Sequence, residues 1–273
     1  MDTVSAHQKT GSLSAAIRLL LIPLLVYCAW FVESFLLAGY NHLFAHPDAT
    51  GLIVYTVISC IITGMILPVI CIRRAFIAGA VTTFQIGFRS ARRTIIACSV
   101  TGILGYTALL VANPYGADKS AFLAAFLLML PTAIAAVMIC WVLAGTHVQA
   151  FVREGGALLS VAVGSVVTSL LFGIATLARG TGGTGPDALF WPVCTGLAAA
   201  LFFFAVRDVY ATVIIVAEST VFLSAGSIDP VWLHTLPPVL PAAALSAGAV
   251  LVAIHWYFSR NYATILVPMR RNE

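Results

Sequence analysis

Repeated runs of about 20 apolar residues constrain the fold of this chain more than any other feature. A helix must have about 20 predominantly apolar residues to cross the roughly 30 Å hydrocarbon layer of a bilayer. The chain has 273 residues, of which 61% are hydrophobic and 9% are charged, whereas soluble domains are about 45–50% apolar and about 25% charged. Too few charged side chains are present to cover a water-facing surface. We therefore predict an all-α, polytopic integral membrane bundle.

Polar breaks divide the chain into eight predicted spans within one transmembrane domain. Residues 189–225 would make roughly 55 Å of continuous helix, which is too long for one span, so we expect a turn at Arg207-Asp208. Small residues at helical spacing, Gly164 and Gly248 among them, favour close packing between the helices. The approximate spans are 15–39, 52–72, 94–113, 121–145, 157–178, 189–206, 209–225 and 238–258.

The distribution of lysine and arginine favours eight spans, because cytoplasmic loops of membrane proteins hold the excess of these residues. With the N-terminus inside, twelve lie on the cytoplasmic side, and only Lys119 and Arg179 lie outside. A seven-span alternative leaves Arg207 in the bilayer and sends the C-terminal arginines outside. We expect a multi-pass protein of the plasma membrane with both termini cytoplasmic, its first span a retained signal anchor.

One observation counts against the turn at Arg207-Asp208. Residues 203–212 contain no Gly, Pro or Asn, and these are the residues that tight turns usually require. Seven spans therefore stay the alternative.

An arginine-rich segment follows the second predicted span. Residues 75–90 place Phe76, Ala80, Phe84 and Phe88 at near-helical spacing, which predicts an amphipathic helix lying in the membrane interface. A plain connecting loop that obeys the positive-inside rule accounts for the segment equally well. In the interfacial interpretation, anionic lipid head groups are the partner of the flanking arginines, which are Arg73, Arg74, Arg89, Arg92 and Arg93.

Two glutamates, Glu33 and Glu218, lie well inside apolar runs. An ionisable group at bilayer depth costs about 2.5–3.5 kcal/mol on insertion scales and commonly marks an ion or proton pathway. We predict a proton or cation site at Glu218, near the middle of its span, and a second candidate at Glu33. A hydrogen-bonded structural role inside the bundle is the alternative for each.

A predicted outer loop has two histidines and a carboxylate in close sequence, at His42, His46 and Asp48. Imidazole and carboxylate at this spacing are ligands for Zn²⁺ or Cu²⁺, and His234 and Asp229 of another outer loop would complete the shell. Histidines without a metal are, however, common in loops. The six cysteines lie in apolar runs without a CxxC pair, so they predict neither a disulfide framework nor a zinc site. Any cofactor stays unknown from the sequence.

The sequence leaves three function classes open. Kinked helices and buried acids favour a transporter or channel for a small solute or ion. Short loops without a catalytic set favour an accessory subunit with membrane-protein partners or a homo-oligomer. An intramembrane enzyme acting on lipid comes third, since polar residues gather on the predicted cytoplasmic face. A net charge of +4 without a polar domain does not predict nucleic-acid binding. The cytoplasmic polar residues are His147, Arg153, Glu154, Arg207, Asp208, His255 and Arg260.

Overall fold

The computed structural model describes residues 20–77, 83–112, 119–181, 185, 187–225, 228, 232–233 and 237–262. Their regular elements are all helical, and this part of the chain contains no strand. Seven helices in this part are long and apolar enough to cross a membrane, and an eighth apolar helix, Val209–Ser224, is shorter. The prediction of an all-α polytopic membrane bundle is confirmed. The seven long helices are Leu20–Gly39, Ala49–Ala75, Ala91–Ala112, Ser120–Phe151, Ala157–Ala178, Asp187–Val206 and Val239–Asn261.

Several long helices change their winding along their length. The first helix ends in a wider π-helical turn, η1, and similar turns occupy the middle of the second and the later part of the fourth. The second is built from α2 (Ala49–Tyr55), η2 (Thr56–Ile66) and α3 (Leu67–Ile77), and the fourth from α6 (Lys119–Ala136), η3 (Val137–Gly145) and α7 (Thr146–Phe151). The remaining elements are η1 (Phe35–Gly39), α4 (Thr83–Ile86), α5 (Ala91–Ala112), η4 (Arg153–Gly155), α8 (Ala157–Ala178), α9 (Asp187–Val206), α10 (Val209–Ser224) and α12 (Val239–Tyr262).

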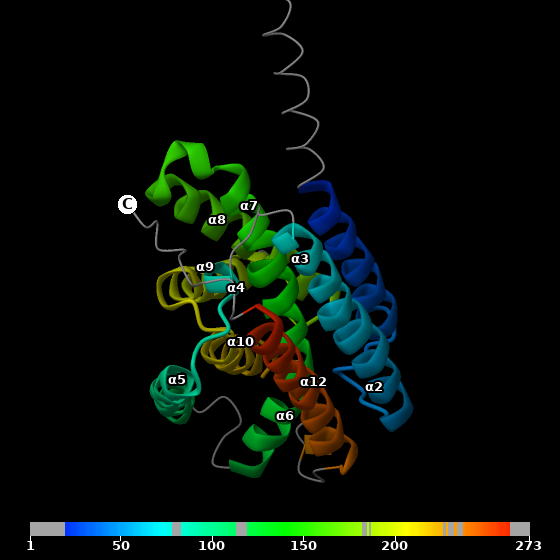
Figure 1. The fold of residues 1–273 in the computed structure, drawn as a ribbon. Helices are drawn as coiled ribbons and strands as arrows, with labels where there is room; N and C mark the ends of the chain where they lie inside the picture. Colours follow the sequence, from blue (N-terminus) through cyan, green and yellow to red (C-terminus); the bar gives the residue numbers. More distant parts are fainter. Residues whose placement is uncertain are drawn as a thin grey trace, which may run out of the picture.

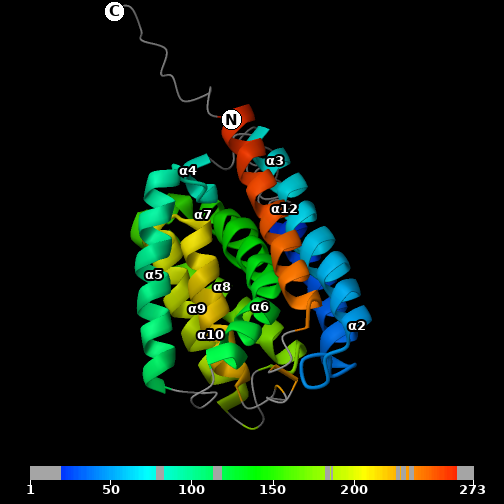
Figure 2. The same cartoon turned by 90° about the horizontal axis from the view of Figure 1, so that it is seen from below.

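The helices run side by side along the bundle (Figures 1 and 2). In Figure 2, the red end of α12 lies at the same end of the bundle as α4 and α7, while α2 begins at the opposite end. At 16 residues, α10 is roughly 24 Å long, shorter than the roughly 30 Å hydrocarbon layer. Its full crossing and the cytoplasmic side of the bundle stay predictions.

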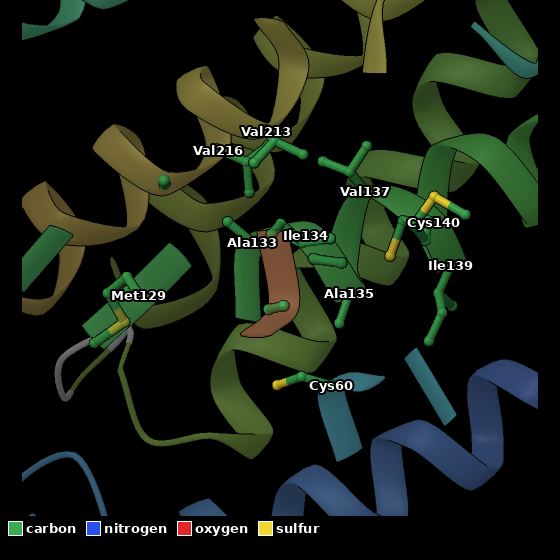
Figure 3. Close-up of a cluster of buried hydrophobic side chains, with 14 of the residues drawn as sticks. Cys60, Met129, Ala133, Ile134, Ala135, Val137, Ile139, Cys140, Val213 and Val216 are labelled. Carbon is green, nitrogen blue, oxygen red and sulfur yellow. The ribbon is translucent and has the colours of Figure 1, made fainter. Parts of the chain in front are cut away.

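The fourth long helix, Ser120–Phe151, forms the centre of the bundle. In its most apolar stretch 72% of the residues are buried, against 11–44% in the other long helices. Figure 3 shows its Ala133, Ile134 and Val137 near Val213 and Val216 of α10. Small residues allow one neighbour to approach closely, since a Cβ atom on Gly64 of η2 would overlap the Cβ atom of Ala135 on this helix.

The two small-residue motifs have different outcomes. A Cβ atom on Gly164 would lie 3.2 Å from Gln149 Cγ and 3.3 Å from Phe204 Cζ, so this glycine is in close contact with α7 and α9. A Cβ atom on Gly248 would meet no atom within 4 Å. Close packing at Gly164 is therefore confirmed, whereas at Gly248 the prediction is wrong because no described neighbour approaches that position.

The helical structure is interrupted between α9 and α10 at Arg207-Asp208, where the eight-span interpretation requires a turn. Arg207 adopts φ 57°, a left-handed conformation that glycine or asparagine usually supplies at the end of a helix. Asp208 is the N-cap of α10, and its Oδ1 accepts the N–H of Ala211 at 3.0 Å. A helix end and a helix start are thus joined without any of the expected turn residues.

Contacts from the arginine-rich segment stabilise this turn. Arg89 donates from Nε to the carbonyl of Arg207 at 3.0 Å, and the N–H of Val209 donates to the carbonyl of Gly87 at 3.1 Å. The Arg207 guanidinium donates to Gln149 Oε1 and to the carbonyl of Gln85. Burial and the nearby Arg89 lower the pKa of Arg207 to about 10, so it is charged at neutral pH.

The segment 75–90 differs from the continuous interfacial helix that its pattern predicts. α3 extends to Ile77, residues 78–82 lie outside the described part, and α4 has only four residues. The ring of Phe88 stacks on the rings of His255 and Phe258, with centroids 5.0 and 5.8 Å away. Phe88, which is half-buried, thus packs against α12, and an interfacial position of the segment stays a prediction.

We expect Asp208→Ala to destabilise the protein by about 1–3 kcal/mol, because it removes a helix cap and a buried acceptor. Asp208 is buried, and Thr94 Oγ1 also donates to its carboxylate at 2.7 Å. Thermal unfolding in detergent measures the effect. Asp48→Ala is the matched control, since Asp48 caps α2 through the N–H of Gly51 but is exposed. Equal losses of stability in both variants would contradict the prediction, because the buried cap at Asp208 would then contribute no more than an exposed one.

Candidate functional site: a glutamate in an apolar cavity

Glu218 lies in the middle of α10 and is only 8% exposed. It is nine residues after Val209, which places it roughly 14 Å along the helix axis from the Arg207 turn. Its carboxyl group packs directly on Gly105 of α5, at a position that a Cβ atom on residue 105 would occupy. A glycine on α5 therefore provides the space for this carboxyl group.

An open cavity of about 520 Å³ lies between α5, α9 and α10, and Glu218 is part of its lining. Most of its surface is apolar, and Glu218 is the one ionisable residue in the described lining. The lining residues include Val100, Leu104, Leu109, Phe202, Ile215 and Phe222.

Hydroxyl groups in the lining do not offer their hydrogen atoms to the cavity. Thr101 donates to the carbonyl of Ala97 at 2.9 Å, Thr195 to Pro192 at 3.0 Å, and Ser219 to Ile215 at 2.7 Å. Each is a bond to the backbone of the same helix, one turn back. Among the described residues, none donates a hydrogen bond to the carboxyl group of Glu218. A buried acid without a protein partner is costly and commonly functional in a membrane.

Glu33, the second predicted acid, lies elsewhere in the bundle. It is half-buried on the first helix and does not line the Glu218 cavity. Its Oε2 atom is buried without a hydrogen-bond partner among the described residues, and the neighbouring Ser34 hydroxyl contacts the hydroxyl of Ser59 at 3.1 Å. The structure therefore does not combine the two glutamates into one site, and a role for Glu33 stays a prediction.

The predicted head-group contacts fall into two groups. Arg73, Arg74, Arg92 and Arg93 are exposed, and their contact with lipid stays a prediction. Arg89 is half-buried and donates to the carbonyls of Arg207 and Val206 at the end of α9. The positive charge of Arg89 is favourable there, because the free carbonyl groups at the C-terminal end of a helix carry a partial negative charge.

The predicted metal ligands are all exposed, and the described residues form no metal-binding group around them. Asp48 uses its carboxylate to cap α2, and His42 adopts φ 50° in the preceding turn. No group of three or more His, Cys, Asp or Glu side chains in the described part is placed to hold a metal ion. His234 and Asp229, the proposed completing ligands, lie outside the described residues. A metal site at His42, His46 and Asp48 stays a prediction.

Polar residues do gather at the end of the bundle that holds the Arg207 turn. The hydroxyl of Tyr210 lies 3.1 Å from Nδ1 of His255, while His147 Nδ1 is 2.7 Å from the carbonyl of Leu143 on its own helix. Arg153 and Glu154 are exposed. Most of these contacts hold helices together, so they give no direct support to an intramembrane enzyme.

The sequence indicated Glu218 as a candidate but did not indicate the residues that surround it. Gly105 and the apolar side chains of α5 and α9 determine the shape of the cavity, and they resemble any other residues of a membrane helix. A glycine within an apolar span was the available signal, yet glycine is common in such helices.

The fold and the site define a multi-pass helical membrane protein with an acidic group in an apolar cavity. Comparisons with protein-family models, curated proteins and solved structures found no match.

Proposed function

We propose that this protein is a transporter that binds a small hydrophobic cation at Glu218 and moves it across the membrane. The observation that supports this most directly is the cavity of about 520 Å³ with one buried carboxyl group in an otherwise mostly apolar lining. Ligand pockets of about 300–1,000 Å³ hold drug-sized molecules. The apolar surface suits the body of such a ligand, and the carboxylate suits its positive charge.

The electrostatics of the cavity favour a cation over other solutes. Attraction between opposite charges is stronger at low dielectric than in water, and the described residues that line the cavity include no lysine or arginine to neutralise Glu218. A strongly polar neutral solute would find few hydrogen-bonding groups, since the hydroxyls of Thr101, Thr195 and Ser219 donate to their own helices.

A carboxyl group in this position supports exchange of the cation for a proton. When the cavity has no ligand, a proton on Glu218 removes the cost of a buried negative charge. When a cation enters, the proton leaves to water and the carboxylate pairs with the ligand. The proton and the cation cannot bind Glu218 at the same time. If the site opens alternately to the two sides of the membrane, transport of the cation in one direction is therefore coupled to transport of a proton in the other.

The accessory-subunit alternative retains one supporting observation. Only 11% of the most apolar stretch of α5 is buried, the smallest share among the long helices, so this helix has free surface for lipid or for a membrane-protein partner. Recovery of a stoichiometric partner after gentle extraction would favour this alternative.

Ethidium uptake into proteoliposomes with an imposed pH difference tests the proposal. We expect Gly105→Leu to reduce uptake at least tenfold, because a side chain at position 105 takes the space of the Glu218 carboxyl group. Gly102→Leu is the control on the same helix, since a Cβ atom there meets only Ile214, at 4.0 Å. We expect it to retain most of the uptake.

Two results would refute the proposal. One is an absence of protein-dependent ethidium uptake in either direction of the pH difference, and the other is equal uptake by the wild type and a folded Gly105→Leu variant. Thermal unfolding of each purified variant establishes that the comparison is between folded proteins.

A further inference from the structure

The cavity that Glu218 lines lies between two helices that hardly touch each other. Both α5 and α9 pack on α10, whereas the described residues of α5 and α9 have almost no contact with one another. Figures 1 and 2 both place α5 at the edge of the bundle. The cavity is therefore a groove with α5 and α9 as its walls and α10 as its floor.

Exposed apolar side chains surround the opening of this groove. Leu104 and Val100 of α5 line the cavity and are 65% and 51% exposed, and Phe222 of α10 is 51% exposed. The charged residues of α5 are all in its first turn, before Thr94. A membrane helix with such a surface is covered by lipid. The groove therefore opens toward the hydrocarbon of the bilayer and not toward water.

The carboxyl group of Glu218 lies deep along the groove. It packs on Gly105, which is twelve residues after Arg93 and thus roughly 18 Å along α5 from the last arginine of that helix. A small hydrated cation would lose most of its water at this depth, at a large cost in free energy. A cation whose charge is spread over an apolar body has little hydration to lose and is already soluble in the surrounding lipid.

We propose that the substrates of the Glu218 site are lipophilic cations dissolved in the bilayer, which reach the carboxylate sideways through the groove between α5 and α9. The negative charge selects cations, and the apolar walls select those that partition into lipid. This inference rests on the proposed cation site at Glu218 and adds the membrane as the source of its ligand.

Spin labels on α5, in protein reconstituted into nanodiscs, test the proposal. Leu104 and Leu110 are both exposed, at 65% and 50%, but only Leu104 lines the cavity. Oxygen dissolves in hydrocarbon, so it should relax the labels of Leu104→Cys and Leu110→Cys, whereas the water-soluble complex Ni(II)EDDA should relax neither. Saturating tetraphenylphosphonium should reduce relaxation by oxygen at least twofold at position 104 and not at 110. The cysteines that are not buried are first replaced by alanine, and these are Cys28, Cys71, Cys98 and Cys194.

Three results would overturn entry from lipid. The first is relaxation by Ni(II)EDDA as strong at position 104 as in Arg153→Cys, where the native side chain is exposed on η4, because the groove would then open to water. The second is an equal effect of tetramethylammonium, a cation with little solubility in lipid. The third is an unchanged effect of tetraphenylphosphonium in a folded Glu218→Gln variant. Glu218→Asp keeps the charge, and we expect it to retain part of the effect.

Ethidium uptake distinguishes failure of this inference from failure of the transport proposal. Leu104→Trp narrows the opening and should slow uptake at least fivefold, whereas Leu110→Trp should stay within about twofold of the wild type. An effect of tetraphenylphosphonium at position 104 without any ethidium uptake would refute transport and support the lipid-side site. Ethidium uptake that is equal in both tryptophan variants, with no effect of tetraphenylphosphonium at position 104, would support transport and overturn entry from lipid.

Discussion

Glutamine in place of Glu218 should abolish pH-driven ethidium uptake, with a loss of at least 100-fold relative to the wild type, or about 2.7 kcal/mol by the usual conversion. Glutamine has nearly the shape of glutamate, so the cavity of about 520 Å³ is preserved. What it removes is the group that alternates between a proton and a negative charge. We therefore expect the variant to fold normally and to lose transport.

Two variants serve as controls for this prediction. Glu33→Gln changes an equally rare intramembrane acid that does not line the cavity, and it should leave ethidium uptake within about twofold of the wild type. Glu218→Asp keeps the charge but shortens the side chain, so partial uptake is expected. Full uptake by Glu218→Gln, with the protein folded in the liposome, would remove Glu218 from the transport mechanism.

Gly64→Val should produce the largest loss of stability among the substitutions considered. A Cβ atom on Gly64 would overlap the Cβ atom of Ala135 on the central helix and would lie 2.9 Å from the carbonyl oxygen of Ser59. Neither neighbour is the flexible end of a long side chain. Overpacking of a core costs about 1–3 kcal/mol and occasionally more, and we expect a value at or above the upper limit because the backbone must move.

Gly248→Val is the matched control for this substitution. Gly248 also lies within a long helix, but a Cβ atom there meets no atom of the described residues within 4 Å. The two variants therefore share the intrinsic cost of valine in a helix and differ in packing. Unfolding of the purified proteins in increasing sodium dodecyl sulfate measures the difference. Similar unfolding curves would show that η2 and α6 are not in close contact in the bilayer.

The positions of the helices could be predicted closely from the sequence. The predicted span 157–178 coincides with α8, and the predicted span 189–206 begins two residues after the start of α9. Such agreement has a simple cause. Lipid provides no hydrogen bonds to the backbone, so a spanning segment must be helical and apolar throughout, and both properties are visible residue by residue.

The turn at Arg207-Asp208 shows where local sequence rules fail. No glycine, proline or asparagine marks it, and its left-handed residue is an arginine. The conformation is stabilised by groups far away in sequence, including Gln149 and Arg89, which are 58 and 118 residues from Arg207. Turn propensities describe neighbours along the chain, and they cannot include such contacts.

By itself, the sequence determined that this chain is a bundle of apolar helices, where most of them begin and end, and that Glu218 is an unusual charge within one of them. Only the tertiary structure decided that Gly105 makes room for that carboxyl group and that it lies in a groove between α5 and α9. The physical reason is that a membrane helix is apolar on nearly every face. Its hydrophobic pattern reveals that it lies in lipid but not which of its faces contacts which neighbour, and the site around Glu218 depends on those contacts.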